Sequence, residues 1–134
     1  MTDKETVAVI DSLVKAYNEG ELDRFMSNFA NEAKIVYEND IVAHDGSAAI
    51  RAFYEKPLKD KNQVEVMQRI SICRHVVDLV RTTKPQASGT TSFLTIYTLS
   101  LGKVVRVDFI DHSFLRQQHP ITKDPCCDAH DRAL

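Results

Sequence analysis

The spacing of apolar residues predicts helices in the first part of the chain. Between Val7 and Tyr17 an apolar residue recurs every three or four positions, which is the period of an amphipathic helix. Thr2 and Glu5 have the spacing of a capping box at its start, and Gly20 supplies its end. A second helix is predicted to follow at once, with one apolar face formed by Leu22, Phe25, Met26, Phe29 and Ala33.

The period then changes to that of short strands. The β-prone runs 35–37 and 41–43 flank residues 38–40, whose composition is typical of a turn, so a small hairpin is predicted. Residues 45–47 offer a turn and an N-cap for a short third helix, which we expect Pro57 to end.

Long strands are predicted from residue 63 to about residue 114. A break near residues 74–75 and a loop over residues 84–89 divide this part of the chain. The first strand alternates apolar and polar positions, and its core-facing residues are predicted to be Val64, Val66, Ile70 and Ile72. Helices followed by a meander of long antiparallel strands make the predicted fold class α+β.

The last strand follows a tight turn at Gly102 and carries two carboxylates of opposite parity. Its apolar residues Val105, Val107 and Phe109 are predicted to face a core, and Arg106 and Asp108 to face outward. The remaining carboxylate, Asp111, falls on the apolar parity. Either the strand ends or bulges before Asp111 and its carboxylate reaches water, or the carboxylate lies at the edge of an apolar cavity.

Composition narrows the class of protein. The 134 residues fit one domain, and a net charge of −2 with mixed signs gives no basic stripe of the kind that nucleic-acid binding requires. There is no apolar signal core and no run of membrane-spanning length, so we expect a soluble, cytoplasmic protein with no membrane partner. Three cysteines do not make a disulfide framework, which also fits a reducing compartment.

Motifs for metals and nucleotides are weak. The four glycines are isolated, so there is no phosphate-binding loop. His119 and His130 flank the adjacent cysteines Cys126 and Cys127, but adjacent cysteines lack the spacing that a tetrahedral zinc site prefers. We therefore expect neither a metal nor an organic cofactor.

Four segments together carry a resemblance to a known family. These are residues 17–25, 29–36, 44–53 and 102–111, in that order and spacing. They resemble the junction of the first two helices, the entry into the first strand, the third helix and the last strand of the NTF2-like superfamily, most similar to its SnoaL-like and steroid-isomerase-like branch.

The resemblance implies a cone in which three N-terminal helices pack in a curved antiparallel sheet around an internal pocket. The domain would span residues 1–115, followed by a polar, mobile tail over residues 116–134. It also implies a homodimer formed through the outer face of the sheet.

This superfold hosts isomerases, epoxide hydrolases, cyclases, dehydratases and non-catalytic binding modules, so the resemblance is more specific for fold than for reaction. Where ketosteroid isomerases carry a carboxylate base and an oxyanion-hole acid, this chain carries Tyr37 and Ser92. SnoaL-type cyclases use an acidic residue in an apolar pocket, a role that Asp111 would match.

The leading hypothesis is that the domain binds, and converts by acid-base chemistry, a small hydrophobic molecule. Asp111 would transfer the proton and Tyr37 would be the orienting hydrogen-bond donor. An enzyme of this kind would be a cofactor-free isomerase, cyclase, hydratase or hydrolase. The residues that either line a ligand cavity or simply fill the core are Tyr17, Phe25, Phe53, Met67, Tyr97 and Phe109.

The alternative hypothesis is a non-catalytic dimerisation or adaptor domain whose cone is filled by its own side chains. For Asp111, the competing interpretation is a solvated acid at the end of a strand. For Tyr17 and Tyr37, it is a core tyrosine with a satisfied hydroxyl.

Overall fold

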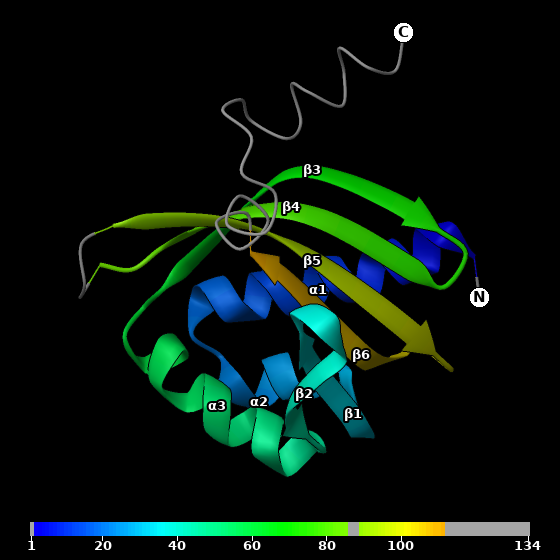
Figure 1. Cartoon of the computed structure of the whole chain (residues 1–134), viewed down its shortest axis with the longest axis horizontal. Helices are drawn as coiled ribbons and strands as arrows, with labels where there is room; N and C mark the ends of the chain where they lie inside the picture. The colour runs from blue at the N-terminus through cyan, green and yellow to red at the C-terminus, as the bar shows by residue number, and fades with distance from the viewer. Residues whose placement is uncertain (1, 86–88, 112–134) are drawn as a thin grey trace, which may run out of the picture.

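The computed structural model describes residues 2–85 and 89–111 (Figure 1). The helices are α1 (Asp3–Glu19), α2 (Leu22–Met26) and α3 (Ser47–Lys59), with a short 3-10 turn, η1 (Glu38–Asp40). The strands are β1 (Phe29–Tyr37), β2 (Ile41–Asp45), β3 (Gln63–Ile72), β4 (His75–Thr83), β5 (Thr90–Ser100) and β6 (Lys103–Asp111). The expected tail over residues 116–134 lies outside the described residues.

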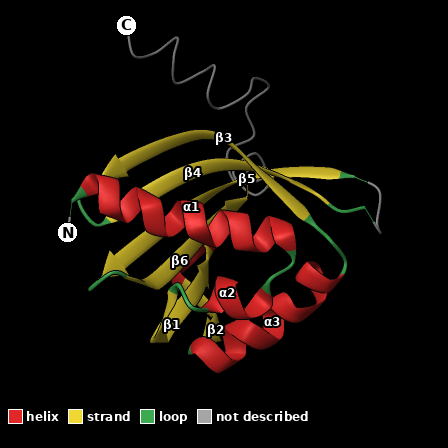
Figure 2. Cartoon of the chain, turned by 180° about the vertical axis from the view of Figure 1, so that it is seen from behind, coloured by secondary structure: helices red, strands yellow, loops and turns green. Residues whose placement is uncertain are grey.

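The strands form one curved sheet in the order β2-β1-β6-β5-β4-β3. The helix α1 lies against its concave face, in front of the sheet in Figure 2 and behind it in Figure 1. The predicted α+β class and the curved sheet are confirmed. The sheet is not antiparallel throughout, because β1 and β6 pair in parallel. These two strands are far apart in sequence, so no hairpin forces them to run in opposite directions.

The first helix is as predicted. The Thr2 side chain accepts a hydrogen bond from the Glu5 backbone, the reciprocal bond completes the capping box, and Gly20 ends the helix with φ of 71°. Pro57 does not end α3 at once, since the helix continues to Lys59.

The predicted extent of the second helix is wrong. The helix α2 ends at Met26, and Phe29 and Ala33 are buried residues of β1. Positions four apart share a face in a strand as well as in a helix, so the apolar spacing from Phe29 to Ala33 fits both structures. Pairing of β1 with β6 and β2 selects the strand.

A bulge at Met67 overturns the predicted parity of β3. The pairing of β3 with β4 shifts register between Val66 and Gln68, so the residues beyond the bulge change faces. As a result Ile70 and Ile72 are 58% and 57% exposed on the convex face, and Arg69 turns toward α1.

A second irregularity adjusts β6. The pairing of β5 with β6 shifts register between Thr98 and Leu99, and Val104 is fully buried where Val105 was expected to be. Beyond this point the predicted alternation is confirmed, because Val107 is buried and Phe109 packs against the core.

Candidate functional site

A cavity of about 560 Å³ lies between the helices and the concave face of the sheet. All four tyrosines of the chain line it, together with five of the six phenylalanines, and the sixth lies outside the described residues. The aromatic lining residues are Tyr17, Phe25, Phe29, Tyr37, Phe53, Tyr54, Phe93, Tyr97 and Phe109. The cavity wall is therefore largely aromatic, with a few hydroxyl groups.

The helices contribute one aromatic cluster. Phe25 of α2 lies 4.6 Å from Tyr54 of α3 and 5.9 Å from Tyr17 of α1, measured between ring centroids. Tyr54 also meets Phe53 edge to face at 4.8 Å. Such tilted pairs are the favoured aromatic geometry, so this wall is well packed.

The sheet contributes a second aromatic cluster. Phe109 of β6 lies 5.5 Å from Phe93 of β5 and 5.9 Å from Tyr37 of β1. Tyr37 is 36% exposed, so one edge of this cluster faces solvent. The cavity is thus enclosed by rings on the helical side and on the sheet side.

The end of α1 is fastened to the edge strand β3. The Asn18 side chain donates to the carbonyl of Val64 at 2.9 Å and accepts from its backbone N–H at 2.7 Å. The amide thereby replaces the missing neighbour strand at this point of the sheet edge. Next to it, the buried Tyr17 hydroxyl is hydrogen-bonded to Asn62. These contacts fix the position of Tyr17 in the cavity wall.

Burial raises the pKa of the cavity phenols above its ordinary value. Burial raises the pKa of Tyr17, and it raises the pKa of Tyr54 well above the usual value. The pKa of Tyr97 is raised by burial and then by the nearby carboxylate of Asp78. At neutral pH these hydroxyls are neutral groups that can donate hydrogen bonds.

A buried ion pair lies beside the cavity on the concave face. Asp78 of β4 is fully buried, and Arg69 of β3 donates to its two carboxylate oxygens at 2.7 and 2.9 Å. Arg69 also contacts the exposed Asp11 of α1 at 2.5 Å. The bidentate bond to Asp78 is the main cause of a raised pKa for Arg69. The network links the sheet to the helix that covers it.

Six of the predicted site residues border the cavity. They are Tyr17, Phe25, Tyr37, Phe53, Tyr97 and Phe109. Met67 does not, because it occupies the bulge in β3 and is 41% exposed, so it neither lines the cavity nor fills the core. The backbone of Asp111 pairs with Phe93, but its side chain lies outside the described part of the chain.

Four lining residues that carry hydroxyl groups were not expected from the sequence. Tyr54 falls within the predicted third helix, and Thr82, Thr91 and Thr95 stood out in no motif. Their strand or helix parity could have placed them on the cavity side. It could not have shown that space remains between them and the opposite wall.

Two charged residues of the described chain line the cavity, namely Glu38 and Lys84. Within residues 2–85 and 89–111, no group of three His, Cys, Asp or Glu side chains could hold a metal ion. The histidines and cysteines at positions 119–130 lie outside these ranges. No helix in the described residues is long and apolar enough to cross a membrane.

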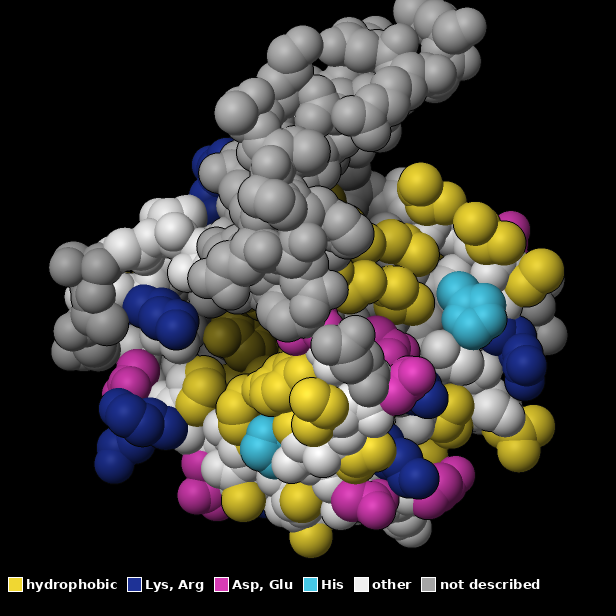
Figure 3. Space-filling model, viewed as in Figure 1, with side chains coloured by type: hydrophobic (Ala, Val, Ile, Leu, Met, Phe, Trp, Pro, Cys, Tyr) yellow, Lys and Arg dark blue, Asp and Glu magenta, His cyan; other side chains and the backbone are white. Residues whose placement is uncertain are grey.

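The convex face of the sheet has a different chemistry. Ile70, Val77 and Ile96 are cross-strand neighbours on β3, β4 and β5, and Leu79 and Leu94 form a second pair beside them. We call these residues and Ile72 the convex apolar patch. Figure 3 shows hydrophobic side chains gathered over β3 and β4 in the same view as Figure 1.

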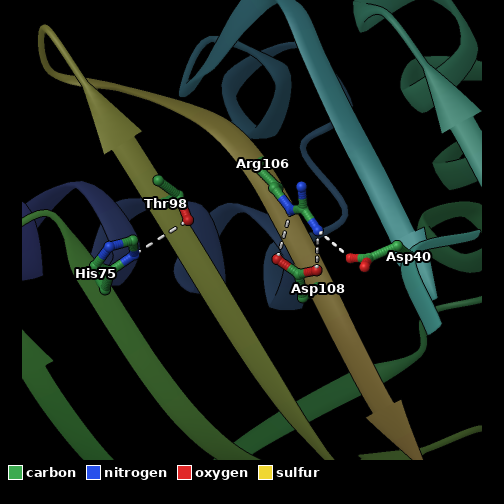
Figure 4. Close-up of polar contacts among 5 residues, drawn as sticks. All are labelled: Asp40, His75, Thr98, Arg106 and Asp108. Carbon is green, nitrogen blue, oxygen red and sulfur yellow. Dashed lines mark hydrogen bonds and ion pairs between the residues drawn. The ribbon is translucent and has the colours of Figure 1, made fainter. Parts of the chain in front are cut away.

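Polar contacts border this patch on β4, β5 and β6 (Figure 4). Arg106 donates to both carboxylate oxygens of Asp108 at 2.9 Å and to Asp40 at 3.0 Å. Nearby, the ring of His75 lies 3.1 Å from the Thr98 hydroxyl. Asp108 thus belongs to the convex face, as its parity predicts, and does not reach the cavity.

No family model matches the chain. Solved structures do match it. A proposed SnoaL-like polyketide cyclase from Jannaschia sp. CCS1 is 14% identical over 86% of this chain and 90% of its own, with a TM-score of 0.70. A proposed ketosteroid isomerase from Kribbella flavida is 15% identical over 81% and 78%, with a TM-score of 0.72.

An NTF2-like protein of unknown function from Cytophaga hutchinsonii is 13% identical, covering 78% of this chain and 87% of that one, with a TM-score of 0.66. At such identities the likeness concerns the fold. The arrangement of helices and curved sheet described above is therefore the one shared by these three proteins.

Proposed function

We propose that this chain, which has the NTF2-like fold, binds a small hydrophobic molecule in the aromatic cavity between its helices and its sheet. The observation that carries the proposal is the cavity of about 560 Å³ with its lining of rings. Small-molecule sites are mostly concave, apolar and a few hundred Å³ in volume, with a small number of polar groups. A cone filled by its own side chains, the alternative considered above, would leave no such space.

The hydroxyls in the wall support a ligand with at least one hydrogen-bond acceptor. Tyr54 and Tyr97 are protonated at neutral pH like any phenol, and burial raises their pKa further. A buried donor gains most from a ligand atom that accepts its hydrogen bond. A planar molecule with a carbonyl or ether oxygen would suit this wall better than a pure hydrocarbon would.

Proton transfer is a further part of the proposal. The backbone of Asp111 pairs with the cavity residue Phe93, and Tyr37 lines the cavity beside Phe109. Asp111 would be the proton-transfer group and Tyr37 the orienting donor. If fused-ring and terpenoid compounds are screened for turnover, Asp111→Asn should abolish turnover and leave binding intact. Equal turnover in Asp111→Asn and wild type would contradict this role.

A second copy of the chain is the proposed partner of the convex apolar patch. Ile70 and Ile72 are exposed there although they are large apolar residues. Beside the patch lies a charged strip formed by Asp40, Arg106 and Asp108, which carries one cation and two anions. A surface that holds both signs beside an apolar block can bring opposite charges of two copies together under a twofold rotation, which suits a homodimer.

Binding can be tested with Prodan, a neutral naphthalene ketone whose emission shifts to the blue in apolar surroundings. We expect saturable binding to the wild-type protein. Val80 is buried and lines the cavity, so Val80→Phe should fill part of the space and weaken binding about tenfold or more.

The matched control is Val42→Phe, the same substitution at a residue of β2 that is 48% exposed and outside the cavity wall. It should bind Prodan like the wild type. Circular dichroism and thermal unfolding would show that both variants fold. Absence of saturable binding, or equal affinity in Val80→Phe and wild type, would overturn the proposed function.

A further inference from the structure

The two charged residues of the cavity wall lie at different places along the sheet. Glu38 follows β1 directly, and Lys84 follows β4. The strands β6 and β5 lie between β1 and β4. Three strand spacings correspond to roughly 14 Å along a sheet. The wall therefore has a negative group near β1 and a positive group near β4.

Two hydroxyl residues accompany the positive group. Thr82 of β4 and Thr91 of β5 are opposite each other in the sheet, and both line the cavity. Lys84 and Thr91 are exposed, so this end of the cavity is open to solvent. A ligand could enter here and leave its polar end near these three residues.

Thr82 is the residue that points to a ligand. The residue is only 6% exposed, and its Oγ1 is buried without a hydrogen-bond partner in the described structure. A buried hydroxyl without a partner is unfavourable, so native structures rarely keep one without a reason. Rotation about χ1 moves Oγ1 to another staggered position, and a position on the cavity side would allow it to meet a ligand atom.

We propose, on the basis of the binding function above, that the ligand is a hydrophobic carboxylate whose head lies against Lys84, Thr82 and Thr91. A carboxylate only accepts hydrogen bonds, and an ammonium group and two hydroxyls can all donate them. The apolar body of the ligand extends among the rings of the cavity. Glu38 lies on the β1 side of the wall, three strand spacings away from this head.

The experiment compares two displacers of Prodan that differ in the head group alone. These are naphthalene-2-carboxylate and its neutral isostere 2-acetylnaphthalene. The carboxylate should displace Prodan at a lower concentration than the ketone does, and this advantage should shrink as salt is raised. Lys84→Met should weaken binding of the carboxylate about five- to tenfold and leave binding of the ketone unchanged.

Substitutions of Thr82 test the position of the head group. Thr82→Val should weaken binding of the carboxylate about three- to tenfold. Thr82→Ser, which keeps the hydroxyl, should bind the carboxylate as the wild type does. The control Lys34→Met removes an exposed charge from β1 outside the cavity wall and should change neither displacer.

The outcomes separate this inference from the proposed function. If Prodan binds and the ketone displaces it as well as the carboxylate does, the cavity binds ligands but the carboxylate head is wrong. Equal losses for both displacers in Lys84→Met would also overturn the inference. If Prodan does not bind at all, the binding function itself fails, and the inference fails with it.

Discussion

The concave and convex faces of this sheet are built from the same strands but have opposite chemistry. On the concave face, rings and hydroxyls surround a cavity, and the charges of Asp78 and Arg69 are paired beside it. On the convex face, aliphatic residues such as Ile70 are exposed beside an ion-paired strip around Arg106. We propose a small ligand for the concave face and a second copy of the chain for the convex face.

A single extra residue in β3 produces much of this difference. Regular alternation would place Ile70 on the concave face and Arg69 on the convex face. The bulge at Met67 reverses both, so the arginine reaches Asp78 and the isoleucine reaches solvent. Bulges and inward-pointing charges on edge strands also discourage pairing with other sheets, which fits the position of β3 at the sheet edge.

The largest expected effect comes from breaking the charge pair of the concave face. Arg69→Met leaves the carboxylate of Asp78 buried without its partner. Removing one member of a buried ion pair typically costs about 3–5 kcal/mol. We expect a loss of that size in the free energy of unfolding, measured by urea denaturation at neutral pH.

The control is Asp11→Asn, which removes the exposed partner of the same arginine. Asp11 is 64% exposed, so this variant should lose less than about 1 kcal/mol. Similar losses in Arg69→Met and Asp11→Asn would mean that the buried pair does not hold the concave face together.

The order of helices and strands could be predicted from the sequence because it depends on local signals. The capping box at Thr2, the stop at Gly20 and the hairpin turn at Gly102 are all determined by a few neighbouring residues. The inward turn of Arg69 could not be predicted in this way. It depends on a shift in pairing with β4, and no residue type within β3 indicates that shift.

The next largest effect is expected on the convex face. Ile70→Glu places a charge in the convex apolar patch at a residue that is 58% exposed, so the monomer should fold normally. If the patch joins two copies, the charge should raise the dimer dissociation constant about 30-fold or more. Analytical ultracentrifugation over a range of concentrations would measure it.

The matched control is Ile41→Glu, in which the wild-type side chain is 61% exposed on β2 and lies outside the patch. It should associate like the wild type. A wild-type protein that stays monomeric at high concentration would exclude the dimer, and with it the proposed role of this face.

A smaller effect on stability is expected at alkaline pH, and it concerns the tyrosines of the cavity wall. The pKa values of Tyr54 and Tyr97 are raised in the folded state, so these phenols stay neutral when those of the unfolded chain ionise. Their contribution to stability is complete below about pH 10 and is lost as the pH rises toward the folded pKa. Each phenol should reduce stability by up to about 1.4 kcal/mol per pH unit in that range.

Urea denaturation between pH 9 and pH 11 would measure this slope, and ultraviolet titration would follow the phenols directly. Tyr97→Phe should reduce this slope by the contribution of one phenol. Titration of all four tyrosines together near pH 10 would contradict the burial on which the ligand proposal depends.

The site was predictable in part for a related reason. The aromatic residues Tyr17, Phe53 and Phe109 fall on apolar parities, so they could be expected either to line a cavity or to fill a core. Which of the two holds depends on the distance between the helices and the curved sheet. That distance follows from tertiary packing, which is why the free space and the unpaired hydroxyl of Thr82 emerge only in the structure.

The smallest expected effect lies in the charged strip of the convex face. Asp40 is 88% exposed and Asp108 is 24% exposed, and both bind Arg106. Asp40→Asn should change the free energy of unfolding by less than about 0.5 kcal/mol, because exposed ion pairs gain little in water. Asp108→Asn removes a bidentate partner that is better shielded, so it should cost more.

If the strip meets its copy in a dimer, Asp40→Asn should weaken association although it hardly affects folding, since burial at an interface strengthens a charge pair. Equal small effects of both variants on unfolding and none on association would mean that the strip is a solvated surface feature.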